Sequence, residues 1–273
     1  MELEAVHAEN PYYGVARFSM DLGWNEKKAR RIRNLAGITA LRRSKKHCSR
    51  TAQTEVSAPD NALRPYIEYI NPDRPWEGAS FDEMTKSGAW VQDFAYINYR
   101  GMWVYWAVVE ELSSRRVLGW SVGLRHTAEL VHSALLDALS GNSAPPILHD
   151  DQGSEYLSFK MQETCRRHSI TMSCSDKGNP WQNGFIESLF CSLKDELGDT
   201  NRFNSLEELY EAMAKVIYYY NHERVHTALK MAPAKHAKQH AKQQAEQAAL
   251  ETNKKSPFLA FWEPKRRLFK TAN

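Results

Sequence analysis

The first forty residues show apolar positions at helical spacing, interrupted by a short turn. Residues 11–23 are predicted to form a short helix, and Asn25 is a suitable N-cap for a second one. That second helix stops near Gly37, and its apolar residues are Ala29, Ile32 and Leu35. A helix, a short turn and a basic helix are the outline of a helix-turn-helix, whose second helix can enter a DNA major groove.

From about residue 89 the pattern of apolar residues becomes that of strands. Residues 90–97, 103–109 and 116–122 are rich in Val, Tyr and Trp and are separated by short turns, which predicts an antiparallel meander. A helix capped by Thr127 follows and ends near residue 141. The later strands are predicted at 147–149 and 170–173, and the later helices at 158–168, 186–193, 206–221 and 234–250. This order predicts an α/β domain with a mixed sheet and flanking helices.

The segment from residue 41 to about 66 has little periodicity and contains Ser, Thr, Pro, Asn and basic residues, which indicates a linker and a domain boundary. We therefore expect four regions. They are a helix-turn-helix DNA-binding module at 1–50, a linker at 51–85, an α/β core at 86–232, and a helical, basic and aromatic tail at 233–273.

The composition indicates a globular protein and argues against membrane, secreted and disulfide-rich proteins. Hydrophobic residues make up 42% and charged residues 25% of the 273 residues, as in ordinary globular proteins. No apolar run approaches the ~18 residues of a membrane span, and the N-terminus lacks the pattern of a signal peptide. We therefore expect a cytoplasmic protein without a membrane partner. Four cysteines without a CxxC pair favour reduced thiols over a disulfide framework or a zinc site.

The net charge of +3 hides a strongly basic segment. Ten Lys and Arg residues and no acidic residue lie between Lys27 and Arg50. Apolar side chains interleave with these charges, so we favour a nucleic-acid partner over a solvated basic linker. The arginines of the predicted second helix are candidates for DNA phosphate contacts: Arg30, Arg31 and Arg33.

Three carboxylates stand out by their positions. Asp93 lies inside the first predicted strand, where a charge is costly unless it is paired or metal-bound. Asp151 follows a short strand, and Glu187 lies on a helix. If the fold brings them together, each pair repels by ~4 kcal/mol at a separation of ~4 Å and an effective dielectric of ~20. Divalent cations would reverse that sign, and carboxylate oxygens suit Mg²⁺ or Mn²⁺.

Four blocks of sequence surround these acids. They are WVQDFAYI at 90–97, SRRVLGW at 114–120, HDDQGSEY at 149–156 and KGNPWQNGFIES at 177–188. Together they resemble the catalytic core of insertion-sequence transposases of the retroviral-integrase type. Thirty-five residues separate Asp151 from Glu187, the spacing from which that family takes its name. Residues 11–38 resemble the helix-turn-helix that precedes this core in the same transposases.

The resemblance implies an RNase H-like fold and metal-dependent cleavage and strand transfer at DNA ends. Asp93, Asp151 and Glu187 would be both the catalytic residues and the ligands of two Mg²⁺ (or Mn²⁺) ions, which clamp the attacking and leaving oxygens of a phosphodiester. The implied partners are double-stranded DNA, at the element's terminal repeats and at the target, and further copies of the chain on that DNA. An upstream-frame partner or fusion is also implied, and the protein would act at the bacterial nucleoid.

The resemblance extends to residues that would contact DNA. In the core these are Lys177, Asn183, Lys194, Arg224 and His226. Lys194 lies two helical turns after Glu187, about 10 Å along the same helix face. The segment YNHERVH at 220–226 resembles a family motif that contains Arg224 and His226. A zinc pair of His222 and His226 has the right spacing, but the lack of a nearby cysteine disfavours it.

Two other functions fit the same residues. A stand-alone nuclease of this fold would cut DNA without joining it, although the basic N-terminal module speaks against a simple hydrolase of RNA–DNA hybrids. An inactive binding module would recognise element ends or regulate transposition, although the intact acidic triad argues against inactivity. Metal-dependent joining of DNA separates the transposase from both alternatives.

Overall fold

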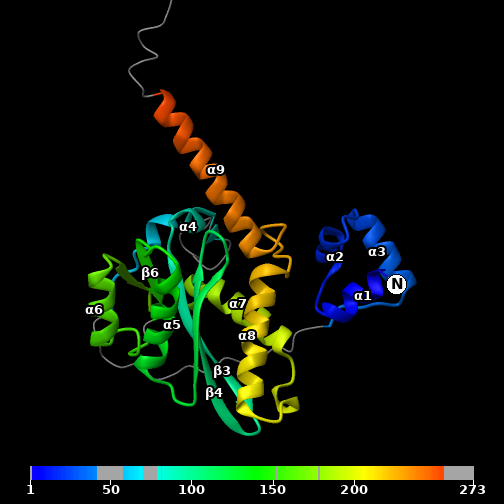
Figure 1. The fold of residues 1–273 in the computed structure, drawn as a ribbon, viewed down its shortest axis with the longest axis horizontal. Coiled ribbons are helices and arrows are strands. Elements are labelled where there is room, and N and C mark those ends of the chain that lie inside the picture. The colour runs from blue at the N-terminus through cyan, green and yellow to red at the C-terminus, as the bar shows by residue number, and fades with distance from the viewer. Residues whose placement is uncertain are drawn as a thin grey trace, which may run out of the picture.

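The computed structural model describes a helical N-terminal module, an α/β domain and a projecting C-terminal helix (Figure 1). The residues described are 2–41, 58–69, 79–80, 82–151, 153–177 and 179–254. The second half of the predicted basic segment, from Arg42 to Arg50, and the end of the tail, 255–273, lie outside them. None of the described helices has the length and apolar character that a membrane crossing requires.

A five-stranded mixed sheet forms the centre of the α/β domain, in the order β5-β4-β3-β6-β7. Strands β3 (Trp90–Tyr99), β4 (Met102–Glu111) and β5 (Val117–Gly123) make the predicted antiparallel meander. Strands β6 (Ile147–Asp150) and β7 (Thr171–Cys174) extend it in parallel with β3. This topology confirms the predicted RNase H-like fold.

Helices cover both faces of the sheet, and each face has its own apolar core. Helices α5 (Ala128–Gly141) and α6 (Phe159–Arg167) pack on one face. Helices α7 (Gly184–Leu197) and α8 (Leu206–His222) pack on the other (Figure 1). The predicted cap of α5 is confirmed, because the side chain of Thr127 accepts a hydrogen bond from the backbone of Leu130. Ser158 and Ser205 cap α6 and α8 in the same way.

The N-terminal module contains the two predicted helices and one that the sequence did not suggest. They are α1 (Glu2–Glu9), α2 (Val15–Asp21) and α3 (Glu26–Leu35). Asn25 caps α3 as predicted, accepting a hydrogen bond of 2.8 Å from the backbone nitrogen of Lys28. A small core of Leu3, Tyr13, Phe18 and Ala29 holds the three helices together. At the other end of the chain, α9 (Pro233–Lys254) projects away from the sheet (Figure 1).

The segment predicted as a linker, 51–85, contains secondary structure in the part that the structure describes. A 3-10 turn η1 (Arg64–Tyr66), a small hairpin of β1 (Glu68–Tyr69) and β2 (Ala79–Ser80), and helix α4 (Asp82–Lys86) lie within it. The side chains of Leu63, Ile67 and Met84 are buried in the core beneath α7 and α8. These apolar residues are too widely spaced to form a periodic pattern, so their burial could not be predicted from local sequence.

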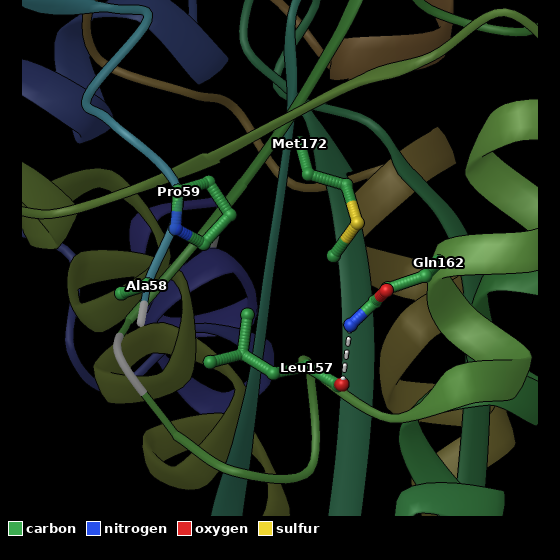
Figure 2. Close-up of a pocket in the computed structure, with 5 residues that line it drawn as sticks. All are labelled: Ala58, Pro59, Leu157, Gln162 and Met172. Atoms are coloured by element: carbon green, nitrogen blue, oxygen red, sulfur yellow. Dashed lines mark hydrogen bonds between the residues drawn. The ribbon is translucent and has the colours of Figure 1, made fainter. Parts of the chain in front are cut away.

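Residues 58–69, called the strap below, start beside the outer strand β7, where the backbone nitrogen of Ala62 donates to the hydroxyl of Ser173, and continue into the core at Leu63 and Ile67. The start of the strap forms one wall of a pocket beside β7 and α6 (Figure 2). The residues that line this pocket are Ala58, Pro59, Leu157, Gln162 and Met172. The strap therefore connects to the edge of the domain rather than hanging free of it.

We predict that Gly119→Ala destabilises the protein by about 3 kcal/mol, or prevents folding. A Cβ atom at Gly119 of β5 would lie 2.3 Å from the backbone nitrogen of Ala138 and 2.4 Å from the carbonyl oxygen of Ala134, both in α5. Urea unfolding measures the effect. Gly141→Ala is the control, because nothing lies within 4 Å of its Cβ position, and it should change the stability by less than about 1 kcal/mol. Equal stability of the two variants would contradict the close β5–α5 packing.

We also predict a pH-dependent stability from Glu110, which is 2% exposed and whose Oε2 has no hydrogen-bond partner among the described residues. Burial raises the pKa of Glu110 from 4.5 to about 8, against the opposing charge of Arg115. The folded state then binds more protons, so the free energy of unfolding falls as pH rises from about 4.5 to about 8, by at most ~1.4 kcal/mol per pH unit. Glu110→Gln should flatten this slope in urea titrations, whereas the exposed control Glu211→Gln should not.

Candidate active site

The register of two parallel strands brings the first two predicted acids together. Trp90 and Val91 of β3 pair with Leu148 and His149 of β6. Continued by two residues, this register sets Asp93 opposite Asp151, just beyond the end of β6. Burial, the charge of Asp151 and, more weakly, the charge of Glu187 raise the pKa of Asp93. Asp93 and Asp151 therefore repel each other across the sheet edge.

The third predicted acid, Glu187, lies in the first turn of α7, which packs against β3. Its side chain is exposed, and partial desolvation raises its pKa. The charge of Glu187 also raises the pKa of Asp93, so Glu187 lies within electrostatic range of Asp93. Among the described residues, however, no three His, Cys, Asp or Glu side chains converge closely enough to share a metal ion.

Short local contacts orient the two aspartates. Oδ1 of Asp93 accepts hydrogen bonds from the backbone nitrogen of Phe94 at 2.8 Å and from the hydroxyl of Tyr156 at 3.4 Å. Oδ1 of Asp151 accepts one of 3.0 Å from the backbone nitrogen of Gly153. A Cβ atom at Gly153 would lie 2.9 Å from that same Oδ1, so only glycine leaves the carboxylate in place.

The donor set fits a hard divalent cation. Within the described chain, none of the three carboxylates forms an ion pair with a Lys or Arg. Neighbouring acids without a protein cation must either take up protons or share a bound cation. Carboxylate oxygens are the ligands that Mg²⁺ and Mn²⁺ prefer. Asp93, Asp151 and Glu187 are therefore the residues that could hold such ions.

The strap anchors the loop that leads into α7, the helix of Glu187. This contact between the strap and the loop was not predicted from the sequence. The amide nitrogen of Asn61 donates to Oε1 of Gln182 at 3.0 Å, and both side chains are buried. Gln182 in turn bonds to the backbone nitrogen and the carboxylate of Asp176. Arg64 closes the network with an ion pair of 2.5 Å to Asp176. A contact across more than a hundred residues leaves no signal in local sequence.

Four of the residues predicted to bind DNA are on the surface. Lys177 lies in the loop before α7, Lys194 on α7, and Arg30 and Arg31 on α3. Their exposure agrees with the prediction without testing it.

Three residues predicted to contact DNA are buried in this structure. Arg33 is 9% exposed, because its guanidinium lies over the ring of Phe18, 5.2 Å from its centroid. Asn183 is 4% exposed at the start of α7. Arg224 is 2% exposed and forms an ion pair of 3.1 Å with Glu196. Arg33 and Arg224 contact other protein groups, and all three side chains are withdrawn from the surface in this fold.

His226 is also poorly placed for contact with DNA phosphates. It is partly buried near α9, and its backbone nitrogen bonds to the carbonyl of Met231. Burial and, more weakly, the nearby charges of Arg115, Arg224 and Arg17 together lower the pKa of His226 to about 4. The imidazole is therefore neutral at physiological pH.

The sequence of the chain is similar to family models and to known proteins. The family model of the integrase core domain matches residues 84–180, and a second integrase core model matches residues 168–233. The transposase for insertion sequence element IS904 of Lactococcus lactis is 30% identical over 233 residues, which are 82% of this chain and 86% of that protein. The putative transposase InsK for IS150 of Escherichia coli is 27% identical over 83% of this chain and 77% of its own length.

Among solved structures, the catalytic core domain of HTLV-2 integrase in complex with magnesium aligns with a TM-score of 0.46 and 22% identity. The alignment covers 55% of this chain and 95% of that domain.

We predict that Asn61→Ala loosens the loop before α7. The substitution removes the donor to Gln182 and the acceptor for the backbone nitrogen of Leu63, both buried, at a cost of about 1–3 kcal/mol. Urea unfolding measures the loss, and hydrogen exchange should show faster opening of residues 175–183. The exposed Asn34→Ala on α3 is the control. Unchanged exchange in the loop would contradict the anchoring role of the strap.

Proposed function

The chain belongs to the family of insertion-sequence transposases that carry an integrase core domain, and from this premise we propose that Asp93, Asp151 and Glu187 form its strand-transfer site. The protein acts in DNA transposition and integration. In our proposal the three carboxylates hold two divalent metal ions, Mg²⁺ or Mn²⁺. The observation that carries the proposal is the β3–β6 register, which sets Asp93 beside Asp151 with Glu187 on the adjacent helix.

The proposed reaction has two steps of the same kind. In the first, water attacks a phosphodiester at the end of the element, and the bond to the 3′ oxygen breaks to leave a free 3′-hydroxyl. In the second, that hydroxyl attacks a phosphodiester of the target, so that one phosphorus–oxygen bond forms as another breaks. Bound divalent ions would supply activation of the attacking oxygen and stabilisation of the leaving one.

The chain's own residues orient this chemistry. Phe94 and Tyr156 fix the carboxylate of Asp93 through its Oδ1. Gly153 fixes that of Asp151. No covalent intermediate is needed in these displacements, and Tyr156, which hydrogen-bonds to Asp93, is fully buried and so cannot serve as a nucleophile.

The N-terminal module is proposed to bind the element's terminal repeats through α3. Its basic side chains and the apolar residues of the same helix line a surface pocket: Lys27, Lys28, Arg31, Ile32 and Leu35. Positive charge on a solvent-facing helix supports contact with a DNA backbone. Because transposition joins two element ends to one target, we further propose that several copies of the chain assemble on DNA at the bacterial nucleoid. The upstream-frame partner stays a prediction.

We predict that Glu187→Gln and Asp93→Asn each reduce metal-dependent 3′-end nicking and strand joining by more than about a hundredfold. Even residues that only support metal ligands are worth about 10–100-fold. The assay uses a labelled duplex that ends in the terminal repeat flanking the gene, with Mg²⁺ or Mn²⁺. Glu211→Gln, exposed on α8, is the control for loss of one carboxylate.

The products separate the competing functions. Strand joining that survives Glu187→Gln would overturn the proposed site. Nicks without joining by the unmodified protein would favour a nuclease. DNA binding without either product, unchanged on adding the fused upstream segment, would favour a binding module.

A further inference from the structure

An exposed group of aromatic side chains lies on the β3–β4 hairpin, outside the carboxylate site. The two outermost rings are Tyr96 and Trp103, which are 44% and 52% exposed and have centroids 6.0 Å apart in an edge-to-face arrangement. Beneath them lie Phe94, Tyr105 and His126. We call these five residues the aromatic platform. Exposed large aromatics that touch one another are uncommon on a soluble protein and indicate a binding surface.

The register of the hairpin explains why the rings share one face. Tyr96 pairs directly with Tyr105, and Trp103 pairs with Asn98, two residues further along β3. Side chains two positions apart on a strand point to the same side, so Phe94, Tyr96, Trp103 and Tyr105 form one surface. The hairpin continues beyond the pairing of β3 with β6, which the register records only at Trp90 and Val91 (Figure 1). Neighbouring strands therefore do not cover this end.

A chain of short contacts joins the platform to the proposed site. His126 stacks on Phe94 with ring centroids 4.0 Å apart, and its Nε2 lies 2.5 Å from the carboxylate of Glu155. Glu155 Oε2 and Asp151 Oδ1 lie 2.7 and 2.9 Å from one point, the Cβ position of Gly153, so the two carboxylates are neighbours. Phe94 directly follows Asp93 in β3, so its ring lies on the opposite face of the sheet from the Asp93 carboxylate, and the platform reaches the site through His126, Glu155 and Asp151. A strand that leaves the scissile phosphodiester along this path passes over the rings.

The chemistry of the platform selects a base rather than a phosphate. The carboxylate of Glu155 at its inner edge repels phosphate oxygens, whereas a ring face accepts any base by stacking. An exposed arginine, Arg125, lies just before His126. Its guanidinium can hold the backbone of a strand whose base lies on the rings. A base within a duplex has both faces stacked, so only an unpaired one can use the platform.

We propose that Tyr96 and Trp103 stack an unpaired nucleobase of the DNA strand next to the phosphodiester that is cut or joined. The inference rests on the proposed function, since it places DNA at the three carboxylates. It adds a requirement that the carboxylates do not impose, namely that the DNA is opened by at least one nucleotide beside the reacting phosphodiester. The platform is thus a binding site for single-stranded nucleotides.

Binding of two DNA probes to the full chain tests the proposal. One is a blunt duplex, and the other is the same duplex with a three-nucleotide single-stranded overhang containing 2-aminopurine. The double variant Tyr96→Ala, Trp103→Ala should lose about tenfold in affinity for the overhang probe and less than about twofold for the blunt probe. Quenching of 2-aminopurine on binding to the unmodified protein should disappear in the variant, because quenching reports stacking.

Two control variants separate base stacking from other effects of the substitutions. Tyr96→Phe with Trp103→Phe retains the rings and should restore both affinity and quenching, which separates stacking from a defect of folding. Tyr218→Ala removes an aromatic residue that is 59% exposed on α8 and should change neither readout. Equal losses for the two probes, or no loss, would overturn the proposal. So would a change of oligomeric state in light scattering with unchanged DNA affinity, because the rings would then contact a second copy.

Failure of this inference is distinguishable from failure of the proposed function. The binding assays need no catalysis, and they can be made with Glu187→Gln to prevent cleavage. Loss of strand joining in Glu187→Gln with unchanged overhang binding by the alanine variant would leave the strand-transfer site standing and refute the platform. Loss of overhang binding in the alanine variant, together with strand joining that survives in Glu187→Gln, would support stacking on the platform. It would refute the three carboxylates as the strand-transfer site.

Discussion

The parallel contact between β3 and β6 is the interaction on which the proposed active site depends. Strand β3 is a middle strand, bonded to β4 on one side and to β6 on the other. The last paired residues, Val91 and His149, fix the two chains in register two residues before each aspartate. A slip of one residue would turn Asp93 to the opposite face of the sheet, because side chains alternate along a strand. Burial of both sheet faces under helices prevents such a slip.

The closeness of the carboxylates creates electrostatic repulsion within the proposed site. Two aspartates at one sheet edge, with a glutamate on the adjacent helix, cannot all be charged without a cation. The surroundings supply hydrogen-bond donors to Oδ1 of each aspartate but no Lys or Arg ion pair within the described chain. The site is thus organised to orient carboxylates rather than to neutralise them. Glu155 extends the negative charge toward the aromatic platform and separates the surface that suits phosphate from the one that suits a base.

The N-terminal module and the core are coupled through the segment after α8. The hydroxyl of Tyr13 accepts a hydrogen bond of 3.0 Å from the backbone nitrogen of Val225, and the hydroxyl of Tyr219 bonds to Asn10. Arg17 donates to the hydroxyl of Thr227 at 3.0 Å. The buried ion pair of Arg224 with Glu196 ties the same segment to α7, the helix that carries Glu187. The motif that resembles a family segment therefore joins the basic module to the core in this fold.

The sequence by itself determined the local elements and the family. Caps such as Asn25 and Thr127, apolar periodicity and short turns are local signals, and they predicted the strands of the five-stranded sheet and the main helices to within a few residues. The acids of the proposed site could be predicted because the motifs around them, and the number of residues between them, are properties of the sequence alone. Only the tertiary structure decided which basic residues face solvent and which polar residues join distant segments. Arg33, Asn183 and Arg224 are buried, and Asn61 reaches Gln182 across 121 positions. The physical reason is that burial and long-range hydrogen bonds depend on the packing of remote segments, which no local pattern encodes.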